Sequence, residues 1–376
     1  MTRRSGHVRV GVIGGGQLAR MMVPPAVELG VDIAVLGESV EAAARIAVTE
    51  VGDHRDLETV LAFARGVDVV TFDHEHVPQP VLRALVDAGI AVRPGPDALQ
   101  HAQDKLVLRR RLQELGIAQP EWAEVADAAE LADFLDRVGG RAVVKTPRGG
   151  YDGHGVRVVS AAHEADDWLA DGPLLAEELV DFRRELAQLV ARRPSGEVAV
   201  WPLVETVQGD GVCREVFAPA PRATALTERV SREIAHRIAD ALGVTGVLAV
   251  ELFEAADDRV LVNELAMRPH NSGHWTIDGA VTSQFEQHLR AVLDLPLGST
   301  EPIAPWSAMI NVLGGPADGD FDARVPLLMA DQPAAKLHLY GKTARPGRKV
   351  GHVTATGEDL DDAVYRARAA VAFLLD

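Results

Sequence analysis

The sequence predicts an α/β protein, α+β overall, in which an N-terminal parallel sheet is followed by regions with antiparallel strands. From residue 8 to about residue 91, short β-rich runs alternate with helical stretches, which is typical of βαβ units and a parallel sheet. Further on, apolar runs at 247–253 and 260–262 flank the turn residues Asp257 and Asp258, which predicts an antiparallel hairpin. A length of 376 residues exceeds one compact core and suits two or three domains.

The first domain is expected to span residues 1–100. Its alternating pattern ends at the cluster Pro94-Gly95-Pro96, and residues 98–116 then form a predicted helix rich in basic side chains. We therefore place a boundary near residue 100. The expected strands are 8–13, 33–36 and 67–72, and the expected helices are 17–29, 56–64 and 80–88.

The second domain is expected to span residues 101–298 and the third residues 299–376. In the second, a helix begins at Asp127, where Glu130 has capping-box spacing, and a later helix ends before Gly243. The run 295–298 (Leu-Pro-Leu-Gly) marks the second boundary, and a small α+β unit follows. Strands are expected at 142–145, 156–159, 186–190, 309–313, 336–340 and 349–354, with a final helix from residue 360.

Composition and charge exclude several classes of protein. The formal net charge is −17, whereas a nucleic-acid surface needs clustered lysine and arginine. No apolar run approaches a membrane span, and the basic start at Arg3 and Arg4 lacks a signal-peptide core, so we expect a cytoplasmic protein. Cys213 is the only cysteine, which excludes an intramolecular disulfide and a cysteine zinc cluster. Any anionic ligand must therefore be met by a local positive pocket.

The second strand of the predicted hairpin leads into a segment dense in polar side chains. Asn263 and Glu264 follow the apolar run 260–262, where we expect a buried strand to emerge into a cleft. If the two aspartates form the loop, Glu251 lies directly across from Glu264, and like charges in this arrangement repel. A hard cation bridging the carboxylates explains this best, and oxygen ligands favour Mg²⁺ bound together with substrate phosphates. The alternative is a different register that turns one glutamate outward.

A glycine-rich turn follows the first expected strand. Gly14, Gly16 and Ala19 have the spacing of a dinucleotide-binding fingerprint, and Glu38 stands at the end of the next expected strand. Glycines let an anion approach the backbone amides at a helix N-terminus, so a phosphate site is expected here whatever the ligand. NAD is one candidate, and a tight packing turn without a ligand is the alternative.

A second glycine-rich segment, residues 143–156, joins two expected strands. A Walker loop needs a following helix and a Gly-Lys-Ser/Thr ending, and both are absent. Its glycines expose amides and allow a flap to close, while Lys145 at the strand end can reach phosphates as a point charge. A plain flexible hairpin is the alternative, against which Lys145, Tyr151 and Asp152 argue.

Three further groups of residues suit parts of a nucleotide or a substrate. Acceptors in 177–180 and at Glu185 suit an adenine amino group and a ribose diol, unless they form a solvated acidic loop. Glu75, between His74 and His76, is expected to face a substrate at the carboxyl edge of the parallel sheet rather than to bind a metal. Near the C-terminus, four cations within eight residues suggest a monophosphate site or a solvated hairpin: Lys342, Arg345, Arg348 and Lys349.

Taken together, these residues resemble the ATP-grasp superfamily and, within it, the 5-(carboxyamino)imidazole ribonucleotide synthases of purine biosynthesis. The resemblance covers nearly the whole chain and includes residues 14–18 and 149–153. Two runs are specific to this family, His-Asn-Ser-Gly-His-Trp-Thr at 270–276 and Arg-Pro-Gly-Arg-Lys-Val-Gly-His at 345–352. The resemblance implies a pre-ATP-grasp domain, an ATP-grasp domain with a mobile lid at about 123–184, a small C-terminal domain and a homodimer.

The resemblance also implies an ATP- and bicarbonate-dependent ligase that carboxylates the exocyclic amine of 5-aminoimidazole ribonucleotide through carboxyphosphate, releasing ADP and phosphate. One or two Mg²⁺ ions would be held by Glu251 and Glu264. The residues implied to bind ATP are Lys105, Lys145, Gly150, Tyr151, Asp152, Gly153, His154, Gly155, Glu177, Glu178, Leu179, Val180, Glu185, Gln208, Asn263 and Glu264. Those implied to bind the ribonucleotide are Gly16, Gln17, Leu18, Glu75, His270, Asn271, Ser272, Lys342, Arg345, Arg348 and Lys349. Those implied in catalysis are Tyr151, Asp152, Arg268 and Lys342.

Carboxyphosphate hydrolyses readily, which gives a flap with Tyr151 and Asp152 a reason to close, and Asp152 is a candidate proton acceptor. The chain departs from the family pattern at Lys105, commonly an arginine, and at Gln208, commonly a histidine. Rival interpretations are a formate-dependent transformylase or biotin-carboxylase-like ligase, which would lack the run 270–276, and a non-catalytic regulator, which the intact acidic positions disfavour. An NAD-dependent oxidoreductase leaves Lys145 and the paired glutamates unexplained.

Overall fold

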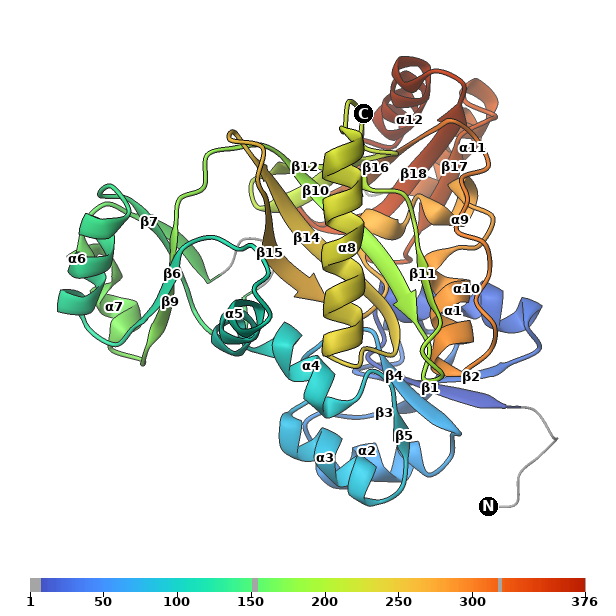
Figure 1. The fold of residues 1–376 in the computed structure, drawn as a ribbon. Coiled ribbons are helices and arrows are strands. Elements are labelled where there is room, and N and C mark those ends of the chain that lie inside the picture. Colours follow the sequence, from blue (N-terminus) through green and yellow to red (C-terminus); the bar gives the residue numbers. More distant parts are fainter. Residues whose placement is uncertain (1–7, 151–154, 317–319, 376) are drawn as a thin grey trace.

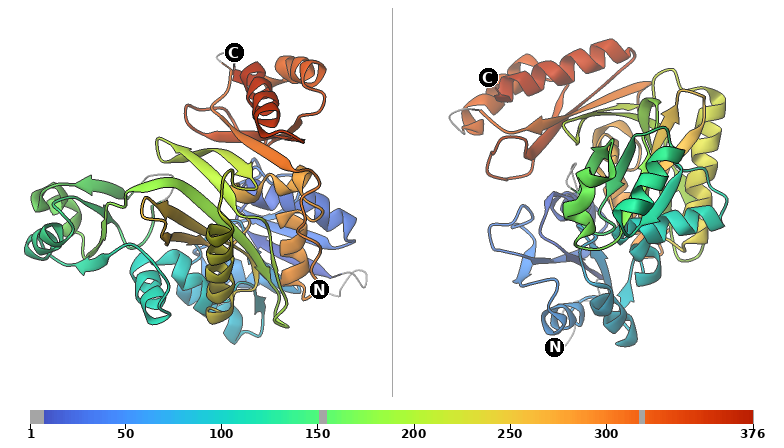
Figure 2. Two further views of the ribbon diagram at one scale, coloured as in Figure 1. Left: turned by 45° about the horizontal axis from the view of Figure 1, so that its top comes forward. Right: turned by 90° about the vertical axis from the view of Figure 1, so that its left-hand side faces the viewer.

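The computed structural model describes residues 8–150, 155–316 and 320–375. Within these ranges the strands form a five-stranded sheet, a nine-stranded sheet and a four-stranded sheet (Figure 1). The nine-stranded sheet occupies the middle of the molecule, and the four-stranded sheet stands off it as a lobe, as the further views in Figure 2 also show. The predicted α/β class with an N-terminal parallel sheet is confirmed.

The N-terminal sheet is parallel, with the strand order β3-β2-β1-β4-β5. Because β1 and β4 are neighbours, the glycine-rich turn after β1 lies beside the polar segment that follows β4. The sequence did not reveal β3, which is largely exposed, or β5, which has two residues. The elements are β1 (Arg9–Ile13), α1 (Gln17–Glu28), β2 (Asp32–Gly37), β3 (Val48–Val51), α2 (Leu57–Ala64), β4 (Val69–Phe72), α3 (Gln79–Asp87) and β5 (Ala91–Val92).

The single helix predicted over 98–116 is wrong, because two helices form there, α4 (Pro96–Gln103) and α5 (Lys105–Glu114). Asp104 lies between them in an extended conformation, with φ −134°. Its carboxylate accepts the amides of Leu106 and Val107 and so caps α5. The break places Lys105 in the first turn of α5.

The lobe is an antiparallel sheet with the order β6-β9-β7-β8. Leu131, Phe134 and Leu135 of its main helix are buried and pack on this sheet. The predicted bounds of β7 and β8 and the predicted cap at Asp127 are confirmed. The elements are β6 (Trp122–Val125), α6 (Ala128–Arg137), β7 (Ala142–Lys145), β8 (Val156–Val159), a 3₁₀ turn η1 (Ala162–Ala165), α7 (Asp166–Leu169) and β9 (Leu174–Glu178).

The large sheet has the order β15-β14-β10-β12-β13-β16-β18-β17, with β11 paired to β10. Helix α8 covers one face, where its Ile234 and Ile238 pack on Leu186 and Leu248. The opposite face carries small residues such as Ala187 and leads to the polar hairpin. The elements up to residue 266 are β10 (Phe182–Arg192), β11 (Val198–Val200), β12 (Val204–Gly209), β13 (Val212–Ala218), α8 (Ala225–Ala241), β14 (Gly246–Ala255) and β15 (Val260–Ala266).

The C-terminal strands belong to this same sheet, because β16 pairs antiparallel with β13. Helix α12 packs on β16 and β18 and buries Ala363, Ala367 and Ala370. The remaining elements are η2 (Asn271–Gly273), α9 (Thr276–Gly279), α10 (Gln284–Val292), β16 (Trp306–Leu313), α11 (Phe321–Asp331), β17 (Lys336–Leu339), β18 (Lys349–Gly357) and α12 (Leu360–Leu375). Among all described helices, none combines the length and apolarity that crossing a bilayer requires.

One buried histidine ties the N-terminal sheet to the large sheet. His288 Nδ1 accepts the amide of Val247 at 3.0 Å, and its Nε2 lies 2.7 Å from Thr71 Oγ1. Burial lowers the pKa of His288 to about 3, so the ring is neutral near pH 7. Since Nδ1 accepts, Nε2 carries the proton and donates to the Thr71 hydroxyl.

We expect His288→Phe to lower the free energy of unfolding by about 2–6 kcal/mol. The substitution keeps a planar ring but leaves the Val247 amide and the Thr71 hydroxyl buried without a partner, at about 1–3 kcal/mol each. Denaturant titration of both proteins measures the loss. Thr71→Val is the matched variant, because it removes one hydrogen bond and should recover part of the loss when added to His288→Phe. Equal midpoints for His288→Phe and the wild type would contradict this account.

Candidate active site

Glu251 and Glu264 face each other across the hairpin of β14 and β15, as predicted. The register that achieves this differs from the predicted one near the turn, where Leu252 pairs with Val262. A bulge at Asn263 then shifts the pairing by one residue and brings Glu251 opposite Glu264. β15 continues past Asn263 and Glu264 to Ala266, so both polar residues lie within the strand.

The carboxyl group of Glu251 is held where its charged form is disfavoured. Burial raises its pKa to about 8, and the carboxylates of Glu264 and Glu185 add to the shift. His270 Nε2 lies 3.3 Å from Glu251 Oε1, but burial lowers the pKa of His270 well below its usual value, so the ring offers a neutral hydrogen bond. A divalent cation fits this donor set, because the carboxylates of Glu251 and Glu264 and the Asn263 amide are hard oxygen ligands.

Lys145 reaches the same hairpin from the lobe. Its Nζ lies 2.7 Å from Glu177 Oε2 and 3.2 Å from Asn263 Oδ1. The other oxygen of Glu177 accepts Nε of Arg109, a residue that the sequence did not single out. Burial alone would raise the pKa of Glu177, but Arg109 and Lys145 outweigh it and hold that pKa below its usual value. Both carboxylate oxygens of Glu177 are therefore engaged by Lys145 and Arg109.

Lys105 joins this cluster from the first turn of α5. Its Nζ lies 3.9 Å from Glu264 Oε1 and donates to the Gly149 carbonyl at 3.0 Å. The glycine-rich segment is tied back on its other side, where the amide of Thr146 donates to the Gly155 carbonyl at 3.0 Å. The described part of this segment stops at Gly150 and resumes at Gly155, so the predicted site residues Tyr151, Asp152, Gly153 and His154 lie outside the described residues.

The segment predicted to contact adenine, residues 177–180, comprises the last two residues of β9 and the two residues after it. Leu179 is exposed and Val180 half-buried, while the Glu178 carboxylate accepts the amide of Glu121 at 3.1 Å. Glu185 lies on β10, where burial raises its pKa against the hydrogen bond from Gln208. The structure thus brings Gln208 to Glu185, and Glu185 in turn to Glu251.

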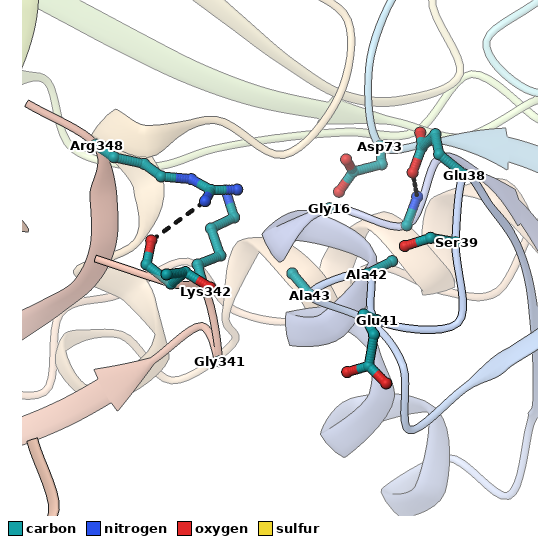
Figure 3. Close-up of a pocket in the computed structure, with 12 residues that line it drawn as sticks. Gly16, Glu38, Ser39, Glu41, Ala42, Ala43, Asp73, Gly341, Lys342 and Arg348 are labelled. Carbon is teal, nitrogen blue, oxygen red and sulfur yellow. Dashed lines mark hydrogen bonds between the residues drawn. The ribbon is translucent and has the colours of Figure 1, made fainter. Parts of the chain in front are cut away.

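A cavity of about 510 Å³ lies between the N-terminal sheet and the C-terminal segment 341–348 (Figure 3). We call it the second cavity, to distinguish it from the site at the acidic hairpin. Lys342 and Arg348 line one side of it, and Gly16, Glu38 and Asp73 line the other. Lys342 Nζ donates to the Gln17 side chain, and Arg45 Nη1 donates to the Gly341 carbonyl at 3.1 Å. These contacts hold the C-terminal segment against α1 and against the segment between β2 and β3.

The helix end at this cavity is already occupied by the protein's own carboxylates. Asp73 Oδ1 accepts the amide of Ala19 at 2.8 Å, and Glu38 Oε2 accepts the amide of Gly15 at 3.3 Å. A Cβ at Gly16 would overlap Asp73 Oδ2, so the glycine is needed for this carboxylate to approach. Burial raises the pKa of Asp73, against the effects of the Ala19 amide and the nearby cations. Two of the amides that the fingerprint would offer to a phosphate, those of Gly15 and Ala19, are therefore already bonded to carboxylates of the chain.

Arg268 connects the acidic hairpin to the second cavity. Its Nε lies 2.6 Å from Glu75 Oε2, while Glu75 Oε1 accepts the amide of Met267 at 3.2 Å. Burial alone would lower the pKa of Arg268, but Glu75, Asp73 and Glu251 raise it above its usual value. Both carboxylate oxygens of Glu75 are thus engaged by the protein.

The remaining predicted site residues differ in burial and in their contacts. Asn271 exchanges two amide hydrogen bonds with Asn311, at 3.0 and 2.8 Å, and the buried Ser272 lies 2.9 Å from His270 Nδ1. Arg345 is exposed and does not line the second cavity. Lys349 acts electrostatically on Glu251 and His270, which places it beside the acidic hairpin. Leu18 is buried in the core beneath the cavity.

Glu38, His54 and His74 bring three potential metal-ligand atoms within 4.8 Å of one another. His74 Nδ1, however, accepts the amide of His76 at 3.2 Å, so the proton is on Nε2. That nitrogen lies 3.6 Å from Glu38 Oε1. A metal-bound histidine instead donates through its second nitrogen, so the orientation of His74 does not suit a metal site.

Three family models match the chain. They are described as a ribonucleotide synthetase preATP-grasp domain over residues 7–103, an ATP-grasp domain over residues 110–285, and a phosphoribosylaminoimidazole carboxylase C-terminal domain over residues 307–366. Similar proteins named N5-carboxyaminoimidazole ribonucleotide synthase occur in Mycobacterium tuberculosis and Corynebacterium ammoniagenes. The first is 52% identical, covering 97% of this chain and 87% of the relative, and the second is 48% identical, covering 98% and 92%.

Solved structures agree over almost the full length. The N5-carboxyaminoimidazole ribonucleotide synthetase of Thermus thermophilus is 40% identical with a TM-score of 0.87, covering 98% of both chains. The synthase of Aspergillus clavatus, solved with ADP and 5-aminoimidazole ribonucleotide, is 34% identical with a TM-score of 0.88, again covering 98% of both chains.

The raised pKa of Glu251 predicts a pH-dependent cost to folding. A folded-state pKa of about 8 against an ordinary value of 4.5 means that the folded chain holds this proton more tightly than the unfolded chain. Stability is therefore lost as pH rises from 4.5 through 8. When a chelator is present to keep metal ions from binding, Glu251→Gln should raise the melting temperature of the protein by several degrees at pH 8.5 and change it little at pH 5. The same gain at both values would show that proton binding at Glu251 is not its cause.

Proposed function

This chain belongs to the family of N5-carboxyaminoimidazole ribonucleotide synthases, and on that premise we propose that its two pockets divide one ligase reaction between them. The reaction uses ATP and bicarbonate to carboxylate the exocyclic amine of 5-aminoimidazole ribonucleotide, and it releases ADP and phosphate as a step of purine biosynthesis. The observation that carries the proposal is the position of Arg268, coupled to Glu251 in one pocket and to Asp73 in the other.

The acidic hairpin and the lobe form the ATP pocket in this proposal. Lys145 and Lys105 approach from two elements and neutralise phosphate charge, and the backbone after Glu177 faces adenine. Mg²⁺, held by Glu251 and Glu264 beside Asn263, would shield the β- and γ-phosphates when bound. The raised pKa of Glu251 supports this role, because a cation removes the repulsion that now disfavours its charged form.

The chemistry proceeds in two displacements. First, a bicarbonate oxygen bonds to the γ-phosphorus, the bond to the β-phosphate oxygen breaks, and ADP leaves carboxyphosphate behind. Second, the amine nitrogen bonds to the carboxyl carbon, phosphate leaves and the nitrogen loses a proton. Arg268 is suited to hold the anionic intermediate at the junction, because Glu75 fixes its guanidinium. Tyr151 and Asp152 remain predicted to cover the intermediate, with Asp152 as proton acceptor.

The cavity beside the C-terminal segment would hold the ribonucleotide, with its phosphate at Lys342 and Arg348. A local pair of cations is what so acidic a chain needs to bind an anion, given its net charge of −17. The homodimer implied by the family also remains a prediction, which light scattering on the purified protein would check.

Phosphate release should require ATP, Mg²⁺ and bicarbonate together and should rise strongly with 5-aminoimidazole ribonucleotide. Omitting each component in turn tests this requirement, and NAD should have no effect. Glu264→Gln keeps the shape of the side chain but removes one charge of the proposed Mg²⁺ site. Its turnover should fall by at least about tenfold, with a higher Mg²⁺ requirement and an unchanged fold. Wild-type turnover at limiting Mg²⁺ would contradict the metal assignment.

Arg348→Ala should weaken ribonucleotide binding about ten- to a hundredfold, the range for a lost charged hydrogen bond, and leave ATP binding nearly unchanged. Arg345→Ala is the matched control, because it removes the same charge from the same segment outside the cavity. Calorimetric titration of each ligand into both variants separates the two pockets. Equal losses for the two variants, or an equal loss for ATP, would assign the segment's charge to long-range attraction or to the nucleotide pocket.

A further inference from the structure

The dinucleotide fingerprint is the motif that the ligase reaction does not explain. Its spacing predicts a phosphate at the start of α1, yet two carboxylates of the chain itself hold those amides. Asp73 accepts from Ala19 and Glu38 accepts from Gly15. The start of α1 therefore presents two carboxylate acceptors to the second cavity.

This arrangement gives the cavity walls of opposite charge. Figure 3 shows Asp73 and Glu38 on one side and Lys342 and Arg348 on the other. Asp73 Oδ2 lies against Gly16 on the cavity wall, while Oδ1 is fixed by the helix amide. A phosphate is repelled by the first wall and attracted by the second, whereas hydroxyl groups prefer the first.

We propose that Asp73 and Glu38 accept hydrogen bonds from the sugar hydroxyls of the ribonucleotide and so select ribose over deoxyribose. This inference rests on the proposed function, because it takes the cavity to be the ribonucleotide site. The sugar phosphate group lies at Lys342 and Arg348, and the hydroxyl edge turns toward the start of α1. The base is then directed along Asp73 toward Arg268, where the carboxyl group is transferred.

The hydrogen bonds that fix the two carboxylates strengthen the selection of ribose over deoxyribose. Each has one oxygen held by a backbone amide, so neither can rotate away from the cavity without losing that bond. A sugar without a hydroxyl leaves a partly desolvated acceptor unpaired, and the expected loss of affinity is about ten- to a hundredfold. Asp73 is the stronger contributor, because Glu38 is more exposed.

Asp73→Asn isolates this role from the role in capping α1. The amide oxygen can still accept the Ala19 amide, while the group that faces the cavity changes from an acceptor to an NH₂ donor. Glu38→Gln does the same at Gly15. Glu50→Gln is the matched control, because it makes the same change on an exposed strand of the same sheet, outside the cavity.

Ribose 5-phosphate and 2-deoxyribose 5-phosphate are titrated by calorimetry into the full-length wild type and the three variants. The wild type and Glu50→Gln should bind ribose 5-phosphate about ten- to a hundredfold more tightly than 2-deoxyribose 5-phosphate. Asp73→Asn should bring this ratio close to one with its melting temperature unchanged, and Glu38→Gln should reduce it. A wild type without preference, or without binding to either sugar at millimolar concentration, would overturn the inference, as would an unchanged ratio in Asp73→Asn.

The inference and the proposed function fail in distinguishable ways. A wild type that shows no ribose preference but releases phosphate in response to 5-aminoimidazole ribonucleotide overturns only the assignment of Asp73 and Glu38. A wild type that does not respond to the ribonucleotide, whatever its sugar preference, overturns the ligase assignment instead.

Discussion

The buried guanidinium of Arg109 is the contact on which the nucleotide-facing half of the molecule depends. Its side chain is 2% exposed and reaches from α5 to the Glu177 carboxylate on β9 and to the carbonyls of Val262 and Asn263, at 2.9 and 2.7 Å. Helix, lobe and hairpin thus meet at one planar group whose donors point in fixed directions. Because Glu177 also holds Lys145, the position of that lysine follows from the position of Arg109.

Separation of charge explains how a strongly acidic chain can bind two phosphorylated ligands. The cations are engaged by particular partners: Lys145 by Glu177, Arg268 by Glu75, Lys342 by Gln17. Carboxylates fill the other positions, including amides at the start of α1 that would otherwise attract phosphate. At the two proposed ligand sites, cations are therefore held in fixed positions by these partners, beside carboxylates that would repel a phosphate.

Most structural features that depend on a short stretch of residues are predictable from the sequence. The β7 and β8 strands, the Asp127 cap and the pairing of Glu251 with Glu264 all follow from patterns within a short stretch. Contacts between distant segments are not predictable in this way, because they leave no local pattern in the sequence. Arg109 looks like part of a solvated basic run, and Asp73 shows no sign that it caps a helix 54 residues earlier. The bulge at Asn263 was also hidden, so the correct glutamate pair came from a register that fails near the turn.

The pairing of β13 with β16 determines where this chain can be cut or extended. β13 contacts β12 on one side and β16 on the other, and its Val216 and Ala218 are buried. A protein shortened before β16 would expose a row of unpaired amides and carbonyls on that strand, an edge that recruits strands from other chains. The C-terminal region is therefore not a detachable module. Insertions and fusions belong instead in exposed turns such as residues 194–197, which join two strands at the rim of the sheet.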